Sequence, residues 1–209
     1  KKAMEAKLGA KVESVSKSGY LGLYEIYADG NILYTDEKMT AFIAGGQLIE
    51  GKTMKNVTEE RMRKLTAIKF SELPLERAIK QVRGDGKRVL ATFEDPNCGY
   101  CKRLAKDLLK LDNVTIYTFL YPILSEDSIR KSKQIWCSAD RAKAWNDWMV
   151  EGRAPAGKED CDTSAVVKNQ EFGRRLNISG TPTMFFGDGE RVPGAMPLPK
   201  IEQKLSQLK

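Results

Sequence analysis

The N-terminal part of the chain has the hydrophobic pattern of short strands. Tyr20–Tyr27 is dense in aromatic and branched residues, and Asp29-Gly30 separates it from the apolar run Ile32–Tyr34. An Asp-Gly pair between two such runs is typical of a tight β-hairpin. A looser alternation at Lys11–Ser16 and an apolar stretch at Ala41–Ile49 extend the pattern. The sequence therefore predicts a small β-rich domain at the N-terminus.

This β-rich domain, residues 1–57, is short for an independent fold. So few residues bury a thin core, and an open antiparallel sheet has edges to protect. Pairing with a second copy of the chain would solve both problems, so we expect this domain to dimerise. The alternative is a subdomain that merely caps the rest of the chain.

A helix is predicted to begin at Thr58 and to continue to about Lys69. Thr58 is suited to the N-cap, and two glutamates follow in the first turn, where the helix dipole favours anions. The apolar positions form a narrow stripe of Met62, Leu65 and Ile68. A helix this polar is suited to connect two domains, so we expect a linker at residues 58–74, ended by Pro74.

From residue 75 onward, strand and helix patterns alternate. Strands are predicted at Arg88–Glu94, Val114–Tyr121 and Thr183–Phe186, and near Val192. Helices are predicted at Leu75–Val82, Gly99–Leu111, Ser128–Trp136, Ala139–Trp148 and Ser164–Leu176, and from Lys200. A strand-helix-strand unit followed by a hairpin predicts an α/β domain over residues 75–209, with a mixed sheet flanked by helices. The helices around residues 123–162 form an insert.

Composition excludes several classes of function. The net charge of +7 is scattered, with no basic stripe interleaved with aromatics, which does not favour nucleic-acid binding. Apolar runs are too short for a helix to span a bilayer, and no intact signal sequence begins the chain. The chain has no histidine, which excludes Ser-His-Asp and Cys-His catalysis and His-ligated metals. Four cysteines remain as the main candidates for chemistry.

Cys98-Gly99-Tyr100-Cys101 directly follows a predicted buried strand and opens a predicted helix. A thiol at a helix N-terminus faces unpaired N–H groups and the positive end of the dipole, and both favour thiolate over thiol. Cys98 is therefore the candidate nucleophile toward disulfides. Cys101, one turn further and less exposed, is the candidate for resolving a mixed disulfide.

Two other interpretations of this pair are weaker. A four-thiolate zinc site would need Cys137 and Cys161, which are 24 residues apart and do not form a second close pair. A purely structural Cys98–Cys101 bridge would close too short a loop to remove much chain entropy. We therefore expect a redox-active pair and no bound metal.

Cys137 and Cys161 are open to two readings. Four cysteines allow three pairings, and if Cys98 pairs with Cys101 the other two close a loop of about 25 residues. Such a bridge stabilises by about 3 kcal/mol and implies an oxidising compartment. The alternative is two buried free thiols in a cytosolic protein.

Thr181-Pro182 before a core strand also has two interpretations. It is either a cis peptide close to the active sulfurs or a trans proline that enters an edge strand.

Together these motifs resemble the bacterial periplasmic protein disulfide isomerases of the DsbC/DsbG type, in the thioredoxin superfamily. The resemblance extends over the whole chain, but its specific motifs lie within residues 88–194. They are Phe93, Cys98-Gly99-Tyr100-Cys101-Lys102, Ile135-Trp136-Cys137, Cys161-Asp162, Gly180-Thr181-Pro182 and Val192-Pro193-Gly194.

The resemblance implies a thioredoxin-like catalytic domain at residues 75–209 and a V-shaped homodimer joined through N-terminal dimerisation domains. Cys98 would attack, Cys101 would be its partner, and the Thr181-Pro182 loop would hold substrate backbone. Cys137–Cys161 would be a structural disulfide, and no cofactor is expected. The mature chain would work in the periplasm after removal of a signal peptide, on misfolded cysteine-containing secreted proteins. A membrane thiol reductase of the DsbD type would keep the pair reduced.

One departure concerns the proton on Cys101. Thioredoxin-like proteins often carry a buried carboxylate six residues before the first cysteine, and here that residue is Thr92. Deprotonation must use another route, for which Glu94 and water are the candidates.

The sequence thus predicts a thiol-disulfide isomerase or reductase with chaperone-like binding of unfolded chain. The alternatives are a dithiol oxidase, although Gly99-Tyr100 is the DsbC-like dipeptide and oxidases have Pro-His, and a non-catalytic holdase whose four cysteines bind zinc.

Overall fold

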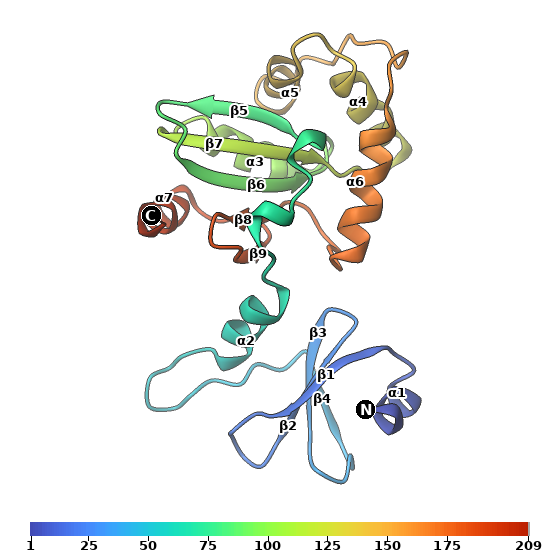
Figure 1. Ribbon diagram of the computed structural model, residues 1–209, viewed down its shortest axis with the longest axis vertical. Coiled ribbons are helices and arrows are strands. Elements are labelled where there is room, and N and C mark those ends of the chain that lie inside the picture. The colour runs from blue at the N-terminus through green and yellow to red at the C-terminus, as the bar shows by residue number, and fades with distance from the viewer. Residues whose placement is uncertain (209) are drawn as a thin grey trace. The chain divides into compact units, whose positions relative to one another are not determined.

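The structure, a computed structural model, describes residues 1–208. The chain divides into two compact units, Lys1–Thr66 and Ala67–Lys209, each with its own sheet (Figure 1). None of the helices within the described residues is long and apolar enough to cross a membrane.

The first unit is a four-stranded antiparallel sheet with one helix before it and one after it. Its elements are α1 (Lys2–Leu8), β1 (Val12–Lys17), β2 (Tyr24–Ala28), β3 (Asn31–Thr35), β4 (Phe42–Ala44) and α2 (Val57–Thr66), with the strands in sequential order. The predicted hairpin is present: β2 and β3 pair directly, and Asp29 and Gly30 both have positive φ, at 47° and 78°. Helix α1 was not predicted from the sequence.

Each face of this sheet has its own apolar cluster. Val12, Ile26 and Ala28 pack with Met4 and Leu8, which lie on α1. On the other face Met62 and Leu65 of α2 join a cluster with Tyr27, Ile32 and Tyr34. Helix α2 thus packs on the small sheet. A salt bridge adds to this packing, because Arg61 of α2 pairs with the buried carboxylate of Glu25 in β2 at 2.8 Å.

The start of α2 differs from the prediction. The N-cap side chain is Asn56, whose Oδ1 accepts a hydrogen bond from the Glu59 N–H at 3.0 Å. Thr58 is the first buried residue of the helix, and its hydroxyl instead bonds Tyr34 Oη at 2.6 Å and accepts from the Leu48 N–H. Tertiary contacts with the sheet therefore use the threonine that local sequence alone assigned to capping. The helix also ends at Thr66, before the predicted Lys69, and Ile68 packs in the second unit.

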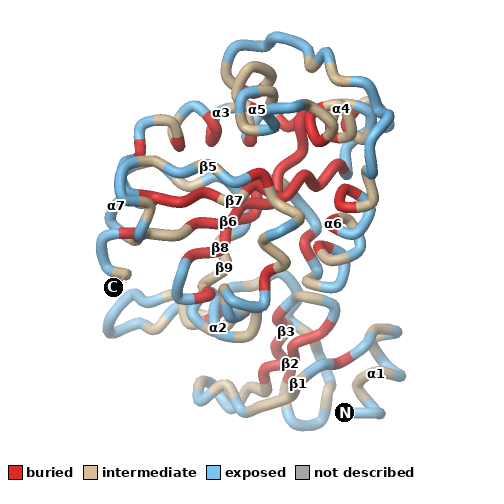
Figure 2. The backbone as a smooth tube through the Cα atoms, turned by 45° about the horizontal axis from the view of Figure 1, so that its top comes forward, coloured by how far each residue is buried: buried red, intermediate tan, exposed pale blue. Residues whose placement is uncertain are grey.

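The second unit is a five-stranded mixed sheet flanked by helices, as predicted. The strands β5 (Ile79–Arg83), β6 (Arg88–Glu94), β7 (Val114–Leu120), β8 (Thr183–Phe186) and β9 (Arg191–Pro193) lie in the order β5-β7-β6-β8-β9, and only β6 and β7 are parallel. The helices are α3 (Gly99–Leu108), α4 (Glu126–Trp136), α5 (Arg141–Met149), α6 (Ser164–Arg175) and α7 (Leu198–Gln207). The central strands are the most buried part of the chain (Figure 2).

Three apolar clusters hold this unit together. Helices α3 and α7 cover one face of the sheet, where Leu104 and Ile201 meet Leu90. Helix α6 lies on the other face, where Phe172 packs near the stacked pair Phe93 and Phe119. In the third cluster, residues of α4 and α5 pack around Cys98 and Cys101. The helical insert therefore forms part of the environment of Cys98 and Cys101.

The predicted helix at Leu75–Val82 is wrong. The structure has a 3-10 turn at Leu75–Arg77 and then strand β5. Along β5 the more buried and the exposed residues alternate with a period of two, and its backbone pairs with β7 at the edge of the sheet. The strand forms because its backbone pairs with β7. Its five residues are too few for the sequence to show a clear strand pattern.

Candidate active site

Cys98 and Cys101 lie where β6 passes into α3. Cys98 is the N-cap residue of α3 and Cys101 lies in its first turn; the two side chains are 7% and 0% exposed. Both are free thiols. The thiol of Cys98 donates a hydrogen bond to the carbonyl of Thr181, with Sγ and O 3.3 Å apart, and the Thr181–Pro182 peptide is cis. The fold thus brings together the cysteine pair and the proline loop, which are 83 residues apart in sequence.

The other two cysteines are joined. Cys137, at the end of α4, forms a disulfide with Cys161, with Cα atoms 5.5 Å apart. The two sulfurs that a four-thiolate zinc site would require are therefore bonded to each other. Within residues 1–208, no group of three or more Cys, Asp or Glu side chains is arranged to hold a metal ion.

The corner before Cys98 is fixed by the buried carboxylate of Asp95. One oxygen accepts from the Asn97 N–H at 2.8 Å and the Ser128 hydroxyl at 2.7 Å. The other accepts from the N–H groups of Ile123 at 2.8 Å and Leu124 at 3.0 Å. Four donors compensate for the burial of one charge, and they tie the corner to α4 and to the segment after β7. The sequence indicates that Asp95-Pro96-Asn97 holds this corner, but it does not reveal the donors, because all but one of them lie some thirty residues away.

Trp148 of α5 holds the same corner from another side. Its indole N–H donates to the Pro96 carbonyl at 2.6 Å. The ammonium groups of Lys102 and Lys131 lie 4.0 Å and 4.7 Å from the centre of its ring. Lys131 also pairs with Asp127, whose carboxylate accepts from the Asn97 side chain at 2.8 Å. The hydrogen bonds from Lys131 and Asn97 lower the pKa of Asp127 to about 2. The insert thus positions the turn that presents Cys98.

Glu94, the last residue of β6, is completely buried. The hydroxyl of Thr92 donates to its Oε1 at 2.7 Å, whereas Oε2 has no hydrogen-bond partner. Burial raises the pKa of Glu94 to about 7. The pKa of Cys101 is raised well above its usual value, chiefly by burial and next by electrostatic interaction with Glu94 and Cys98. Glu94 and the Cys101 thiol therefore influence each other electrostatically.

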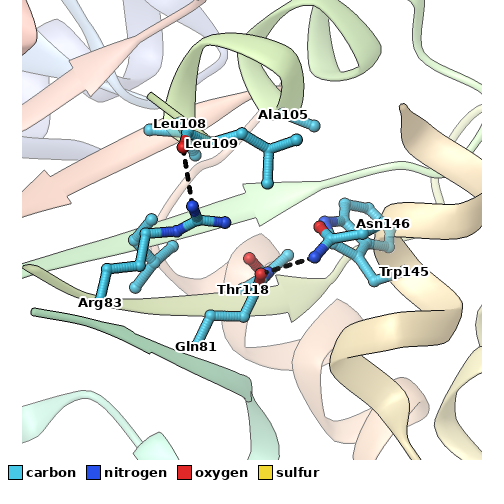
Figure 3. A pocket seen from close by; sticks show the side chains of 9 residues that line it. Gln81, Arg83, Ala105, Leu108, Leu109, Thr118, Trp145 and Asn146 are labelled. Carbon is cyan, nitrogen blue, oxygen red and sulfur yellow. Dashed lines mark hydrogen bonds between the residues drawn. The ribbon is translucent and has the colours of Figure 1, made fainter. Parts of the chain in front are cut away.

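A small cavity lies behind the redox helix, between α3, α5 and strands β5 and β7 (Figure 3). Arg83 donates to the Leu109 carbonyl at 2.7 Å, and Asn146 donates to Gln81 at 2.9 Å, across its walls. None of its lining residues is a cysteine. The cavity belongs to the packing beneath α3 and not to the redox site.

Comparisons with known proteins agree with this geometry. The family model for a thioredoxin-like domain matches residues 75–209, and that for the disulfide bond isomerase N-terminal domain matches residues 1–59. A probable thiol:disulfide interchange protein DsbC of Bordetella parapertussis is 50% identical over 197 residues, 94% of this chain and 69% of that protein. The thiol:disulfide interchange protein DsbC of Escherichia coli K12 is 26% identical over 208 residues, 97% of this chain and 84% of that protein.

Solved structures agree with these matches. A disulfide interchange protein from Neisseria gonorrhoeae is similar with a TM-score of 0.61 and 42% identity, covering 65% of this chain and 97% of that one. The thiol-disulfide exchange protein alpha-DsbA2 from Wolbachia pipientis shares the fold. Its TM-score is 0.52 at 17% identity, and the match covers 71% of this chain and 93% of that one. The chain belongs to the DsbC family of thiol:disulfide interchange proteins within the thioredoxin superfamily, and it is a thiol-disulfide oxidoreductase.

Proposed function

We propose that this chain is a disulfide isomerase that rearranges wrong disulfides in secreted proteins. The observation that carries the proposal is the pair of free thiols at the start of α3, with the thiol of Cys98 against the carbonyl of the cis Thr181–Pro182 peptide. Cys98 reacts with substrate and Cys101 resolves the intermediate. The Thr181-Pro182 loop holds substrate backbone, Gly99 and Tyr100 separate the two sulfurs, and Cys137–Cys161 is a structural bridge.

The first step is attack of the Cys98 thiolate on one sulfur of a substrate disulfide. A bond forms between Cys98 and that sulfur, the substrate S–S bond breaks, and the second substrate sulfur leaves as a thiolate. Cys98 has the position for this role because it is the N-cap residue of α3 and because it is the more accessible of the two cysteines.

The mixed disulfide then has two exits. In isomerisation, another substrate thiolate attacks the bonded substrate sulfur and releases Cys98 as a thiolate. In reduction, Cys101 attacks the sulfur of Cys98, the substrate sulfur leaves, and a Cys98–Cys101 disulfide remains. Since the pKa of Cys101 is raised, its thiolate is scarce at neutral pH, and the second exit is slow. A long-lived mixed disulfide favours isomerisation.

The second exit needs an acceptor for the proton of Cys101, and we assign it to Glu94. Its Oε2 has no partner in a completely buried site, and its charge acts on Cys101. A pKa of about 7 makes the carboxylate able to accept a proton at neutral pH and to return it in the reverse reaction. Glu94 thus takes the role for which Thr92 has no suitable group.

The assembly and location belong to the same proposal. We assign residues 1–57 to dimerisation and residues 75–209 to catalysis. Residues 58–74 are the linker, within which α2 packs on the small sheet and Ile68 packs in the second unit. The match of residues 1–59 to the isomerase N-terminal domain supports the first assignment, and sedimentation of the purified chain tests it. The chain would act in the periplasm, where a membrane reductase of the DsbD type would return the cysteine pair to thiols, and it would bind unfolded chain as a chaperone does.

Refolding of scrambled ribonuclease tests the isomerase. The wild-type chain is expected to restore ribonuclease activity, Cys98→Ala to lose this ability, and Cys101→Ala to retain part of it. Full activity of Cys98→Ala would contradict the proposal. A glutathione redox titration separates isomerase from oxidase, because an isomerase holds a sizeable reduced fraction at the potential of its compartment and an oxidase is almost wholly disulfide-bonded.

A further inference from the structure

Two apolar side chains, those of Ile123 and Leu124, project into solvent directly after β7. Ile123 is 39% exposed and Leu124 is 56% exposed. Within residues 1–208 they are the only consecutive pair among the exposed large hydrophobic residues. Pro122 before them is buried, and its carbonyl accepts from the Gln170 side chain at 2.5 Å. The two exposed side chains therefore follow directly after a buried residue whose carbonyl is hydrogen-bonded.

The backbone of this pair is held in place by the redox corner. The N–H groups of Ile123 and Leu124 both donate to one oxygen of Asp95. Because both N–H groups are directed at the buried carboxylate, the chain curls around it, and the side chains stay outside. The backbone of the exposed pair is thus fixed by two hydrogen bonds to Asp95.

The same contacts place the pair beside Cys98. Strands β6 and β7 are parallel neighbours, so the segments that follow them emerge at the same edge of the sheet. The Tyr121 N–H donates to the Glu94 carbonyl at 2.8 Å, and the Cys98 N–H donates to the Asp95 carbonyl at 3.1 Å. The side chain of Asp95 thus holds the apolar pair while its carbonyl holds the Cys98 N–H, so the pair and Cys98 lie at one corner of the fold.

We propose that Ile123 and Leu124 form an apolar lip that binds the residues flanking the reacting cysteine of a protein substrate. The proposal rests on the isomerase function above and deepens it. The occupant is an extended segment of unfolded polypeptide with a large aliphatic or aromatic side chain next to its cysteine. The side chains of Ile123 and Leu124 can form neither ion pairs nor hydrogen bonds, so the lip they form selects for apolar neighbours. Tyr100, 62% exposed within the motif, adds a further apolar surface near the sulfur.

The test uses small substrates that differ only beside the cysteine. Two peptides carry leucine or serine on either side of one cysteine, each joined to glutathione by a mixed disulfide; oxidised glutathione is the third substrate. Rates of reaction with the reduced protein are compared for wild type, Ile123→Ser/Leu124→Ser, and Val167→Ser. Val167 is a matched control, 47% exposed on α6 and remote in sequence from the corner. Serine keeps both backbone N–H groups that bond Asp95.

We expect the double variant to lose about fivefold or more of its rate with the leucine peptide. Its rates with the serine peptide and with oxidised glutathione should stay within about twofold of wild type, and Val167→Ser should match wild type with all three substrates. Equal losses with all three substrates would show a disturbed Cys98 and overturn the lip, as would an unchanged rate with the leucine peptide. The ribonuclease assay tests the isomerase function separately, so failure of either proposal is recognisable.

Discussion

Two neighbouring carboxyl groups at the end of β6 have different chemistry because their hydrogen-bond partners differ. Asp95 accepts four hydrogen bonds and holds the turn before Cys98. Glu94 accepts one, from Thr92, and its second oxygen has no partner. A buried carboxylate without full compensation favours its protonated form, which explains the raised pKa. One residue therefore fixes geometry, and the other can exchange a proton.

The role of Glu94 predicts a pH profile for the resolving step. In a preformed mixed disulfide between Cys98 and glutathione, release of glutathione by Cys101 should speed up as pH rises through about 7, because the carboxylate form of Glu94 accepts the proton. Glu94→Gln should release glutathione more slowly, by about a hundredfold or more, and without that inflection. Stopped-flow measurement of the released thiol gives the profile. The exposed Glu126→Gln is the control, and an inflection that persists in Glu94→Gln would assign the proton to water.

Glu94 also predicts a pH dependence of stability. Its pKa is 4.5 in the absence of the fold's influence and about 7 in the folded chain, so the folded state binds more protons between these values. The free energy of unfolding should therefore fall as pH rises from about 4.5 to about 7, by about 3 kcal/mol. Urea unfolding of wild type and Glu94→Gln at pH 5 and pH 8 measures it. The free energy of unfolding of Glu94→Gln, minus that of wild type, should be larger at pH 8 than at pH 5. The same value at both pH values would contradict the account.

At the level of elements, α4 and α5 support the turn that presents Cys98. Trp148 of α5 bonds the Pro96 carbonyl, and Asp127 of α4 bonds the Asn97 side chain. Neither contact touches a sulfur, so both helices act by positioning. Their sequence patterns predicted two helices but not these contacts, since the partners meet only after the insert packs against α3.

Removal of the indole N–H of Trp148 tests this positioning. Trp148→Phe keeps a ring between Lys102 and Lys131 but loses the bond to Pro96, a contact worth about 1 kcal/mol or about fivefold in an equilibrium constant. We expect its thiol-disulfide equilibrium with glutathione to move toward the disulfide by about that factor, because the bond to Pro96 holds the turn in the arrangement in which Cys98 and Cys101 are free thiols. Trp136→Phe, which loses an N–H bond to Asp162 beside the other disulfide, is the matched control. Equal shifts in both variants would contradict a specific role of Trp148.

Element prediction succeeded where apolar runs were long and failed where pairing or packing decided the outcome. Arg88–Glu94 and Thr183–Phe186 are strands with the predicted bounds because continuous apolar runs mark buried strands. Strand β5 was mistaken for a helix because an edge strand of five residues has little pattern of its own. The capping role of Thr58 was wrong because the small sheet recruits its hydroxyl.

At the level of the whole molecule, all the groups assigned to the redox chemistry lie in the second unit. The cysteine motif and the Thr181-Pro182 loop were recognisable from sequence because their chemistry is local and their residue types are distinctive. The hydrogen-bond partners of Asp95 and the role of Trp148 were not, because they depend on contacts between segments far apart in the chain. A motif can thus identify the reaction, while the tuning of its groups requires the fold.

The central claim is that Cys98 alone forms the covalent bond to substrate. Incubation of Cys101→Ala with scrambled ribonuclease, followed by rapid alkylation and mass spectrometry of the disulfide-linked peptides, tests it most directly. The account predicts a stable adduct that joins Cys98 to ribonuclease cysteines, with Cys137 and Cys161 still joined to each other. Adducts at Cys137 or Cys161, or the absence of any adduct at Cys98, would contradict it.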